Sequence, residues 1–348
     1  MEKLETKLKT IESWWLGKNT GRPLFKKVLT EELPVSSLKW ENEKDIPNFE
    51  TIIKNPTIPD NIYLGEACPT AYHLWGERGT PMTMSAYLGG EVLFRENSVW
   101  VEPVVKDWQD FKIRFDKENY WVQISRQLME KQAELCKGDF LISLPDLGDA
   151  LTCMSLLRGT ENMLFDVIEK PNIIKEKIKE FTDAWIEAHT YFYEVYKTKL
   201  SGDCSWLLWA PGKTYACQCD FSTMISPDLF EELVVFELER MKDYLEYIIW
   251  HLDGFEEVRH LDILLGLPYI KSFQIATGAG NPPCASDKWL PIIRKIVESG
   301  RTAYVYASNE EEVTTLVKNL PPEKLFIDGG IPGNNIQEVD NFIKDLIT

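Results

Sequence analysis

Short apolar runs alternate with longer amphipathic segments through the last two thirds of the chain. The amphipathic segments, which we expect to be helices, cover 172–198, 227–245, 287–299, 309–316 and 336–347. Buried strands that alternate with helices are typical of a parallel sheet covered by helices. The runs that we expect to be strands are 140–144, 206–209, 216–221, 248–250, 272–275, 303–306 and 325–327.

The number of predicted strands favours a closed barrel. With 62–64 added, the count reaches about eight, as a (β/α)8 fold requires. An open doubly wound sheet is the alternative, but it normally carries a glycine-rich phosphate turn after its first strand, and none is present. We therefore predict an α/β protein, a (β/α)8 TIM barrel over residues 61–348 with an N-terminal extension, residues 1–60, packed on it.

The first third of the chain has a more mixed pattern. Residues 3–15 predict a helix, and 110–136 predict a long helix with charged and aromatic sides. Between them, apolar runs at 92–95 and 99–101 flank Glu-Asn-Ser, which indicates a β-hairpin.

Composition and charge narrow the class of protein. Hydrophobic residues make up 44% and charged residues 27%, as in a globular protein with a large core. The net charge of −17 repels nucleic acid and anionic membranes, so neither is an expected partner. The charged N-terminus is no signal peptide, and no run approaches the roughly 18 apolar residues that span a bilayer. We therefore expect a cytoplasmic protein whose seven cysteines are reduced.

The strongest candidate chemistry stands at the end of the strand at 248–250, because barrel sites lie just past the carboxyl ends of strands. His251 and Asp253 are two residues apart, so in an extended strand they point to the same face. Asp253 could orient His251 for acid–base catalysis, or both could bind a metal such as zinc. The alternative is a packed histidine followed by an Asp-Gly turn.

Two more aspartates follow predicted strands. Asp220 comes after Cys217 and Cys219, whose thiols we expect to be buried and inert, and it is a candidate proton donor or substrate contact. Asp146 is a candidate substrate contact, or else part of a helix N-terminal turn.

The remaining candidates are weaker. Glu66 and His73 follow the first candidate strand, in a loop that could close over the site or be structural. Cys284, in a loop that we expect at the surface, could supply a thiolate to a metal held by His251. Aromatic side chains near strand ends could form a flat pocket or a methylammonium cage, although core filling is the default reading of each. The residues expected to shape this pocket are Trp209, Tyr215 and Gln274.

Residues 203–330 resemble the uroporphyrinogen decarboxylase superfamily. The likeness rests on Cys-Asp-Phe-Ser-Thr-Met-Ile-Ser-Pro at 219–227, Ile-Trp-His-Leu-Asp-Gly at 249–254, His-Leu-Asp at 260–262 and Ile-Asp-Gly-Gly at 327–330. That superfamily has a (β/α)8 fold and includes the haem-pathway decarboxylase and cobalamin-dependent methyltransferases. The resemblance therefore implies a barrel enzyme with its site around His251.

Two departures from the superfamily change the expected chemistry. The decarboxylase's arginine-rich N-terminal signature has only a faint echo at 21–24, so we reject a polycarboxylate substrate and haem biosynthesis. The thiol-directed methyltransferases hold zinc with a His-x-Cys pair and a later Cys, but here Asp253 and Gly329 take the cysteine positions. A thiol substrate is therefore not expected, whereas His251 and Asp253, with Cys284, could form a harder zinc site.

The leading hypothesis is a methyltransferase that demethylates a small O- or N-methylated compound. The acceptor would be the cobalt of a corrinoid on a separate protein, with His251 and Asp253 supplying the acid or metal. Asp220 and Asp146 would orient the substrate. The alternatives are a decarboxylase or lyase acting on a small organic acid, and a non-catalytic ligand-binding barrel. The chain could also pair as a homodimer.

Overall fold

A parallel sheet forms the centre of the molecule. The computed structural model describes residues 4–18, 21–29, 49–54, 56, 62–71, 82–95, 98–205, 208–278 and 280–347. Within them, a seven-stranded sheet has the order β2-β1-β13-β12-β11-β10-β9, and only the β1–β2 pair is antiparallel. The mixed α/β class is therefore confirmed. The strands are β1 (Leu24–Leu29), β2 (Ile62–Gly65), β9 (Thr214–Cys217), β10 (Tyr247–Asp253), β11 (Ile270–Ala276), β12 (Thr302–Tyr306) and β13 (Leu325–Asp328).

The first strand of the chain lies beside the last one. β1 pairs in parallel with β13, with Leu24 opposite Phe326 and Lys26 opposite Asp328. Residues 1–60, predicted as an extension, therefore contribute a strand to the sheet. β2 runs antiparallel at its edge, so the prediction of 62–64 as the first parallel strand is wrong.

Short strands and hydrogen bonds continue beyond β1. The Glu66 N–H donates to the Phe25 carbonyl over 2.8 Å, and β3 (Thr70–Ala71) pairs in parallel with β6 (Leu141–Ile142). The Leu144 N–H donates to Cys204 of β7 (Asp203–Cys204) over 2.9 Å, and the Asp203 carboxyl accepts from the N–H of Thr214 in β9 over 3.0 Å. Hydrogen bonds thus link β3 to β6, the segment after β6 to β7, and β7 to β9.

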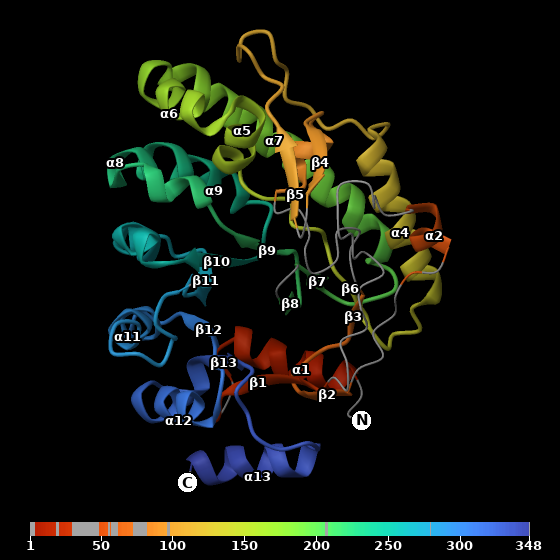
Figure 1. Cartoon of the computed structure of the whole chain (residues 1–348). Coiled ribbons are helices and arrows are strands. Elements are labelled where there is room, and N and C mark those ends of the chain that lie inside the picture. Colours follow the sequence, from red (N-terminus) through yellow and green to blue (C-terminus); the bar gives the residue numbers. More distant parts are fainter. Residues whose placement is uncertain are drawn as a thin grey trace.

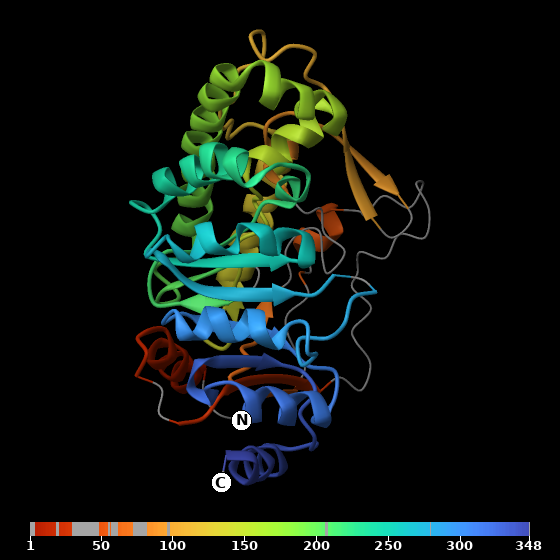
Figure 2. The same cartoon turned by 90° about the vertical axis from the view of Figure 1, so that its left-hand side faces the viewer.

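Helices lie along one side of β9–β13 (Figures 1 and 2). They include helices in the predicted segments 227–245, 287–299 and 309–316. None of the helices within the described ranges is long and apolar enough to cross a membrane. The helices are α1 (Leu4–Trp15), α2 (Phe49–Lys54), α3 (Met84–Tyr87), α4 (Tyr120–Leu135), α5 (Ala150–Arg158), α6 (Thr160–Glu169), α7 (Pro171–Tyr196), α8 (Pro227–Leu229), α9 (Phe236–Met241), α10 (Leu261–Leu265), α11 (Leu290–Glu298), α12 (Glu310–Asn319) and α13 (Ile336–Ile347).

Outside the sheet, the predicted hairpin is present, whereas the predicted helices differ in part from those of the structure. The hairpin of β4 (Glu91–Arg95) and β5 (Ser98–Glu102) is confirmed. The predicted helix at 110–136 begins only at Tyr120, because the Asn119 side chain accepts from the N–H groups of the first turn and caps it there. Helices α5 and α6 were not predicted.

The helix α1 packs against the starting ends of the parallel strands. The Trp14 ring meets Phe326 of β13 edge-on at 5.7 Å, and the Trp15 ring meets Tyr247 at the start of β10 at 5.3 Å. Figure 2 shows α1 at the side from which β10 and β11 start. The carboxyl ends of the strands, on the opposite side, are therefore where a site can form.

Candidate active site

His251, Gln274 and Tyr306 form a hydrogen-bonded row across three neighbouring strands. His251 lies directly opposite Gln274 in the β10–β11 pairing, and its Nδ1 is hydrogen-bonded to the Gln274 Oε1. The Gln274 Nε2 donates to the Tyr306 hydroxyl at the end of β12, over 3.0 Å. The sequence singled out His251 and Gln274, but it gave no sign of Tyr306.

This row orients the imidazole. With the amide as placed, Oε1 can only accept, so Nδ1 of His251 must donate to it. The Nε2 atom is then the one that can give or take a proton, or bind a metal, in chemistry with a substrate. Gln274 therefore acts as the partner that sets which ring nitrogen is reactive.

Three hydrogen-bond donors converge on one oxygen of Asp146, just past β6. Its Oδ1 accepts from the Tyr215 hydroxyl over 2.8 Å, from the Gln218 Nε2 over 2.9 Å and from the Gly148 N–H over 3.1 Å. Burial raises the pKa of Asp146, whereas these donors and the nearby charge of His251 lower it. Tyr215 is therefore a support for Asp146, and its ring packs edge-on against Trp185 of α7 at 4.8 Å.

Asp220 and Asp253 approach each other from consecutive strand ends. Asp220 opens a short 3-10 helix (Asp220–Met224) after β9, and Asp253 ends β10. Burial, followed by the charges of Asp146 and Asp253, raises the pKa of Asp220 to about 6. Asp220 therefore changes charge near neutral pH, as an acid–base group must.

The buried carboxyl of Glu257, which sequence reasoning missed, joins these two segments. It accepts from the Ser222 hydroxyl over 2.9 Å and from the Asp253 N–H over 3.0 Å. Burial raises the pKa of Glu257 to about 8, with further contributions from Asp220 and Asp253. The signal in the sequence was two adjacent glutamates, which are more often an exposed pair at the start of a helix.

A second polar group joins the first and last strands. The Lys26 Nζ lies 2.9 Å from the Asp328 Oδ2, and the Tyr304 hydroxyl donates to the same oxygen over 2.6 Å. Lys26 and Asp328 line an open groove of about 600 Å³ together with Gly329 and Gly330. Lys26 was not predicted, because the chain around β1 carries no recognisable motif. Tyr304 was predicted only as part of a strand.

Several predicted site residues lie elsewhere. Both carboxylate oxygens of Glu66 are engaged, one by Arg22 over 2.5 Å and one by the Phe25 N–H over 3.0 Å. Trp209 belongs to β8 (Trp209–Ala210), not to a parallel strand, and its carbonyl accepts from Trp15 of α1. Of the strand predicted at 206–209, residues 206 and 207 lie outside the described residues, and Trp209 is in a strand that does not belong to the parallel sheet. Trp209 therefore lies at the α1 side, away from His251. His73 lies outside the described residues.

The described residues do not form a ready zinc site. Among them, no three His, Cys, Asp or Glu side chains are placed to hold one metal ion. Cys284 lies in a loop whose Asn281 and Pro283 are exposed, as expected, but its own side chain is buried. Its thiol donates to the Ile275 carbonyl, and burial raises its pKa to about 11. Zinc binding by His251, Asp253 and Cys284 stays a prediction.

The buried thiols near the site match their prediction. Cys217 and Cys219 are buried, and burial raises the pKa of each thiol well above its ordinary value. They therefore remain protonated and chemically inert at neutral pH.

Comparison with known proteins identifies a shared fold. No protein-family model matches the chain, and no curated protein matches it in sequence. Its structure is similar to that of a methyltransferase from Methanosarcina mazei, with a TM-score of 0.60 and 12% sequence identity over 99% of this chain and 98% of that chain. The two proteins thus share one fold over nearly their whole length.

Proposed function

We propose that this protein is a methyltransferase that moves a methyl group from a small O- or N-methylated compound to the cobalt of a corrinoid on a separate protein. The observation that supports it most is the gathering of His251, Asp253, Asp220 and Asp146 at the strand ends, in a chain whose whole length folds like a methyltransferase. Fold likeness alone does not fix an activity, so the site carries the proposal.

The proposal includes a closed (β/α)8 barrel. Its eight strands would be β1, β3, β6 and β9–β13, because β3 and β6 pair in parallel and the short β7 is hydrogen-bonded both to the segment after β6 and to β9. In such a barrel all the carboxyl ends meet at one face, which would place Lys26 and Asp328 opposite His251 across one mouth.

The proposed reaction is a displacement at the methyl carbon. The electron pair of Co(I) forms the cobalt–carbon bond while the carbon–oxygen or carbon–nitrogen bond breaks. A leaving oxygen needs a proton, which the His251 Nε2 or Asp220 can donate. Asp146, held by three donors on one oxygen, can orient the substrate without moving itself.

Loss of carbon dioxide from a small organic acid is the second candidate, because Asp220, with its pKa near 6, could protonate the product carbanion. The charge of the site disfavours it. Asp146, Asp220, Asp253 and Glu257 have no lysine or arginine partner among the described residues, and Lys26 is paired with Asp328. A carboxylate substrate would meet repulsion there, whereas a neutral or cationic methyl donor would not.

A parallel assay distinguishes the two reactions. Purified protein is mixed with free cob(I)alamin and a panel of methoxylated and N-methylated compounds, and methylcobalamin is followed by absorbance. Carbon dioxide release from a panel of small acids is measured separately. We expect methylcobalamin with at least one donor and no carbon dioxide. Carbon dioxide release without methyl transfer would contradict the proposal and favour a lyase. If neither reaction occurred, the proposal would also be contradicted, and a ligand-binding barrel would be favoured.

A further inference from the structure

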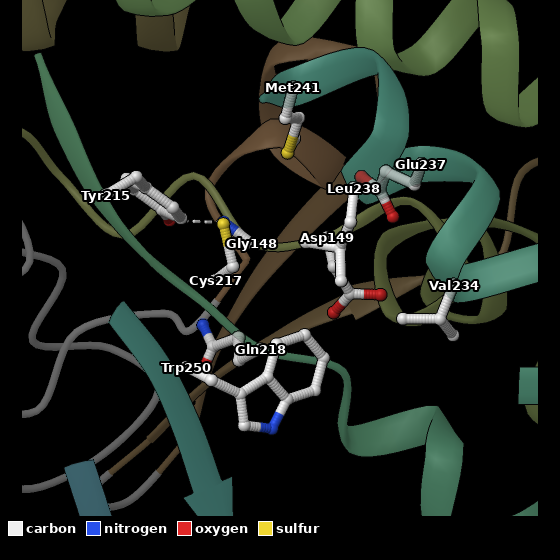
Figure 3. A pocket seen from close by; sticks show the side chains of 10 residues that line it. All are labelled: Gly148, Asp149, Tyr215, Cys217, Gln218, Val234, Glu237, Leu238, Met241 and Trp250. Atoms are coloured by element: carbon white, nitrogen blue, oxygen red, sulfur yellow. Dashed lines mark hydrogen bonds between the residues drawn. The ribbon is translucent and has the colours of Figure 1, made fainter. Parts of the chain in front are cut away.

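A small cavity lies between the sheet and α9 (Figure 3), and the three residues that hydrogen-bond to Asp146 are part of its wall. Its volume of about 10 Å³ has room for one water molecule. Apolar and neutral side chains make up most of its wall, and neither lysine nor arginine lines it. The lining residues are Gly148, Asp149, Tyr215, Cys217, Gln218, Val234, Glu237, Leu238, Met241 and Trp250.

Two carboxyl groups face this cavity from different elements. Asp149 caps α5 by accepting the Thr152 N–H on Oδ1 over 2.9 Å, and the Cys219 thiol is a further side-chain partner of its carboxyl. Its buried Oδ2 accepts from no N–H or O–H group within the described part of the chain. Glu237, on α9 and 4% exposed, accepts the Ala150 N–H on both of its oxygens, over 3.0 and 3.1 Å. Figure 3 shows both side chains at the cavity wall, with Asp149 above the Trp250 ring.

We propose that this cavity is a buried proton-binding site, in which Asp149 and Glu237 share one proton with the help of a single water molecule. Two ionised carboxyls in a dry space without a cation would repel each other strongly. One proton removes one of the two charges and supplies a hydrogen-bond donor. The water fits the cavity volume and would donate to the Asp149 Oδ2.

The surroundings agree with a bound proton. Burial raises the pKa of Asp149 to about 7 and that of Glu237 well above its ordinary value. The charge of Asp220 adds to the rise in the pKa of Asp149, and the charge of Asp149 adds to the rise in the pKa of Glu237. The ionisable groups that face the pair from neighbouring elements are the thiols of Cys153, Cys217 and Cys219 and the carboxyls of Asp146, Asp220 and Glu257. All are neutral or negative, so none replaces the proton.

The site couples the proton to the candidate active site. Asp149 and Asp146 belong to the same short turn between β6 and α5, and Glu237 holds the first N–H of α5. When the proton leaves at alkaline pH, two negative charges face each other across the cavity and push this turn away from α9. The inference goes beyond the proposed function and does not depend on it.

The test compares pH-dependent unfolding of the full chain with that of two matched variants. Glu237→Gln keeps the shape of the side chain but cannot hold the shared proton. Glu239→Gln is the control, because Glu239 lies on the same helix and is paired with Lys242 near the surface. If the folded state binds one proton more than the unfolded chain, the unfolding equilibrium constant rises tenfold for each unit by which the pH is raised, from about pH 4.5 to the folded pKa.

We expect urea titrations between pH 5 and 8 to show a slope lower by one proton in Glu237→Gln than in the wild type, with Glu239→Gln unchanged. The infrared band of a protonated carboxylic acid should be present in the wild type at pH 7 and weaker by one group in Glu237→Gln. Asp149→Asn serves in the same way if Glu237→Gln fails to fold. Equal slopes, or an unchanged acid band in a folded variant, would overturn the proposal.

Discussion

At the residue scale, the carboxyl of Asp146 is the most heavily supported group of the site. Tyr215 gives its hydroxyl hydrogen to Asp146 and accepts the Gly148 N–H on the same oxygen over 2.8 Å. We predict that Tyr215→Phe lowers the free energy of unfolding by about 1–3 kcal/mol, since it leaves buried polar groups without a partner. Tyr306→Phe, at a residue that is 41% exposed, should cost less in the same urea titration. An equal cost for both would contradict this role.

The partner of His251 can be tested at the same scale. Gln274→Leu removes the acceptor that keeps the hydrogen of His251 on Nδ1. We predict a lower rate constant for methyl transfer with little change in KM, because the substitution acts on the ring of His251 and not on Asp146, which is proposed to orient the substrate. The loss should be smaller than the roughly 10²- to 10⁴-fold that removal of an acid–base group costs. Unchanged steady-state kinetics would show that this hydrogen bond does not orient the catalytic ring.

At the scale of elements, one ion pair joins the first and last strands. Lys26 of β1 pairs with Asp328 of β13, and both are partly buried. We predict that Lys26→Met lowers the free energy of unfolding by about 1–3 kcal/mol, because it leaves the Asp328 charge without its cation. Lys9→Met is the control, since its pair with Glu5 within α1 is exposed to solvent and should contribute little to stability. Equal chemical-denaturation midpoints for the two variants would exclude a structural role for the β1–β13 pair.

The elements also show what sequence patterns can and cannot predict. The strands β10–β13 and the helices α11 and α12 were predicted because burial repeats with a clear period there, whereas the short α10 was not predicted. β1 was missed because Lys26 and Lys27 interrupt its apolar pattern, and these lysines are satisfied by Asp328, Ile331 and Gly333 in the folded chain. In the site, the polar residues at strand ends were predicted from the same pattern. The hydrogen bonds made by Gln218, Glu257 and Tyr304 were not, because they form only when separate strand ends come together in the fold.

At the scale of the whole molecule, the buried carboxyls set the pH dependence of stability. The buried Glu257 and the half-buried Asp146 have a raised pKa, so the folded state holds protons that the unfolded chain releases. Stability should therefore fall as pH rises from about 5 to 8, by about 1.4 kcal/mol for each pKa unit of each group. His260, with its lowered pKa, acts in the opposite direction but is a single group. Thermal melts that are flat or rising over this range would contradict the prediction.

Methyl transfer to cobalt is the central claim at this scale, and a single-turnover measurement tests it most directly. The protein is mixed in excess with cob(I)alamin and the best methyl donor, and formation of methylcobalamin is timed by absorbance. We predict that His251→Gln lowers the rate by roughly 10²- to 10⁴-fold. Asp262→Asn, which changes an exposed carboxyl on α10, should match the wild type. Transfer at the same rate in His251→Gln and the wild type, or no transfer from any donor, would contradict the account.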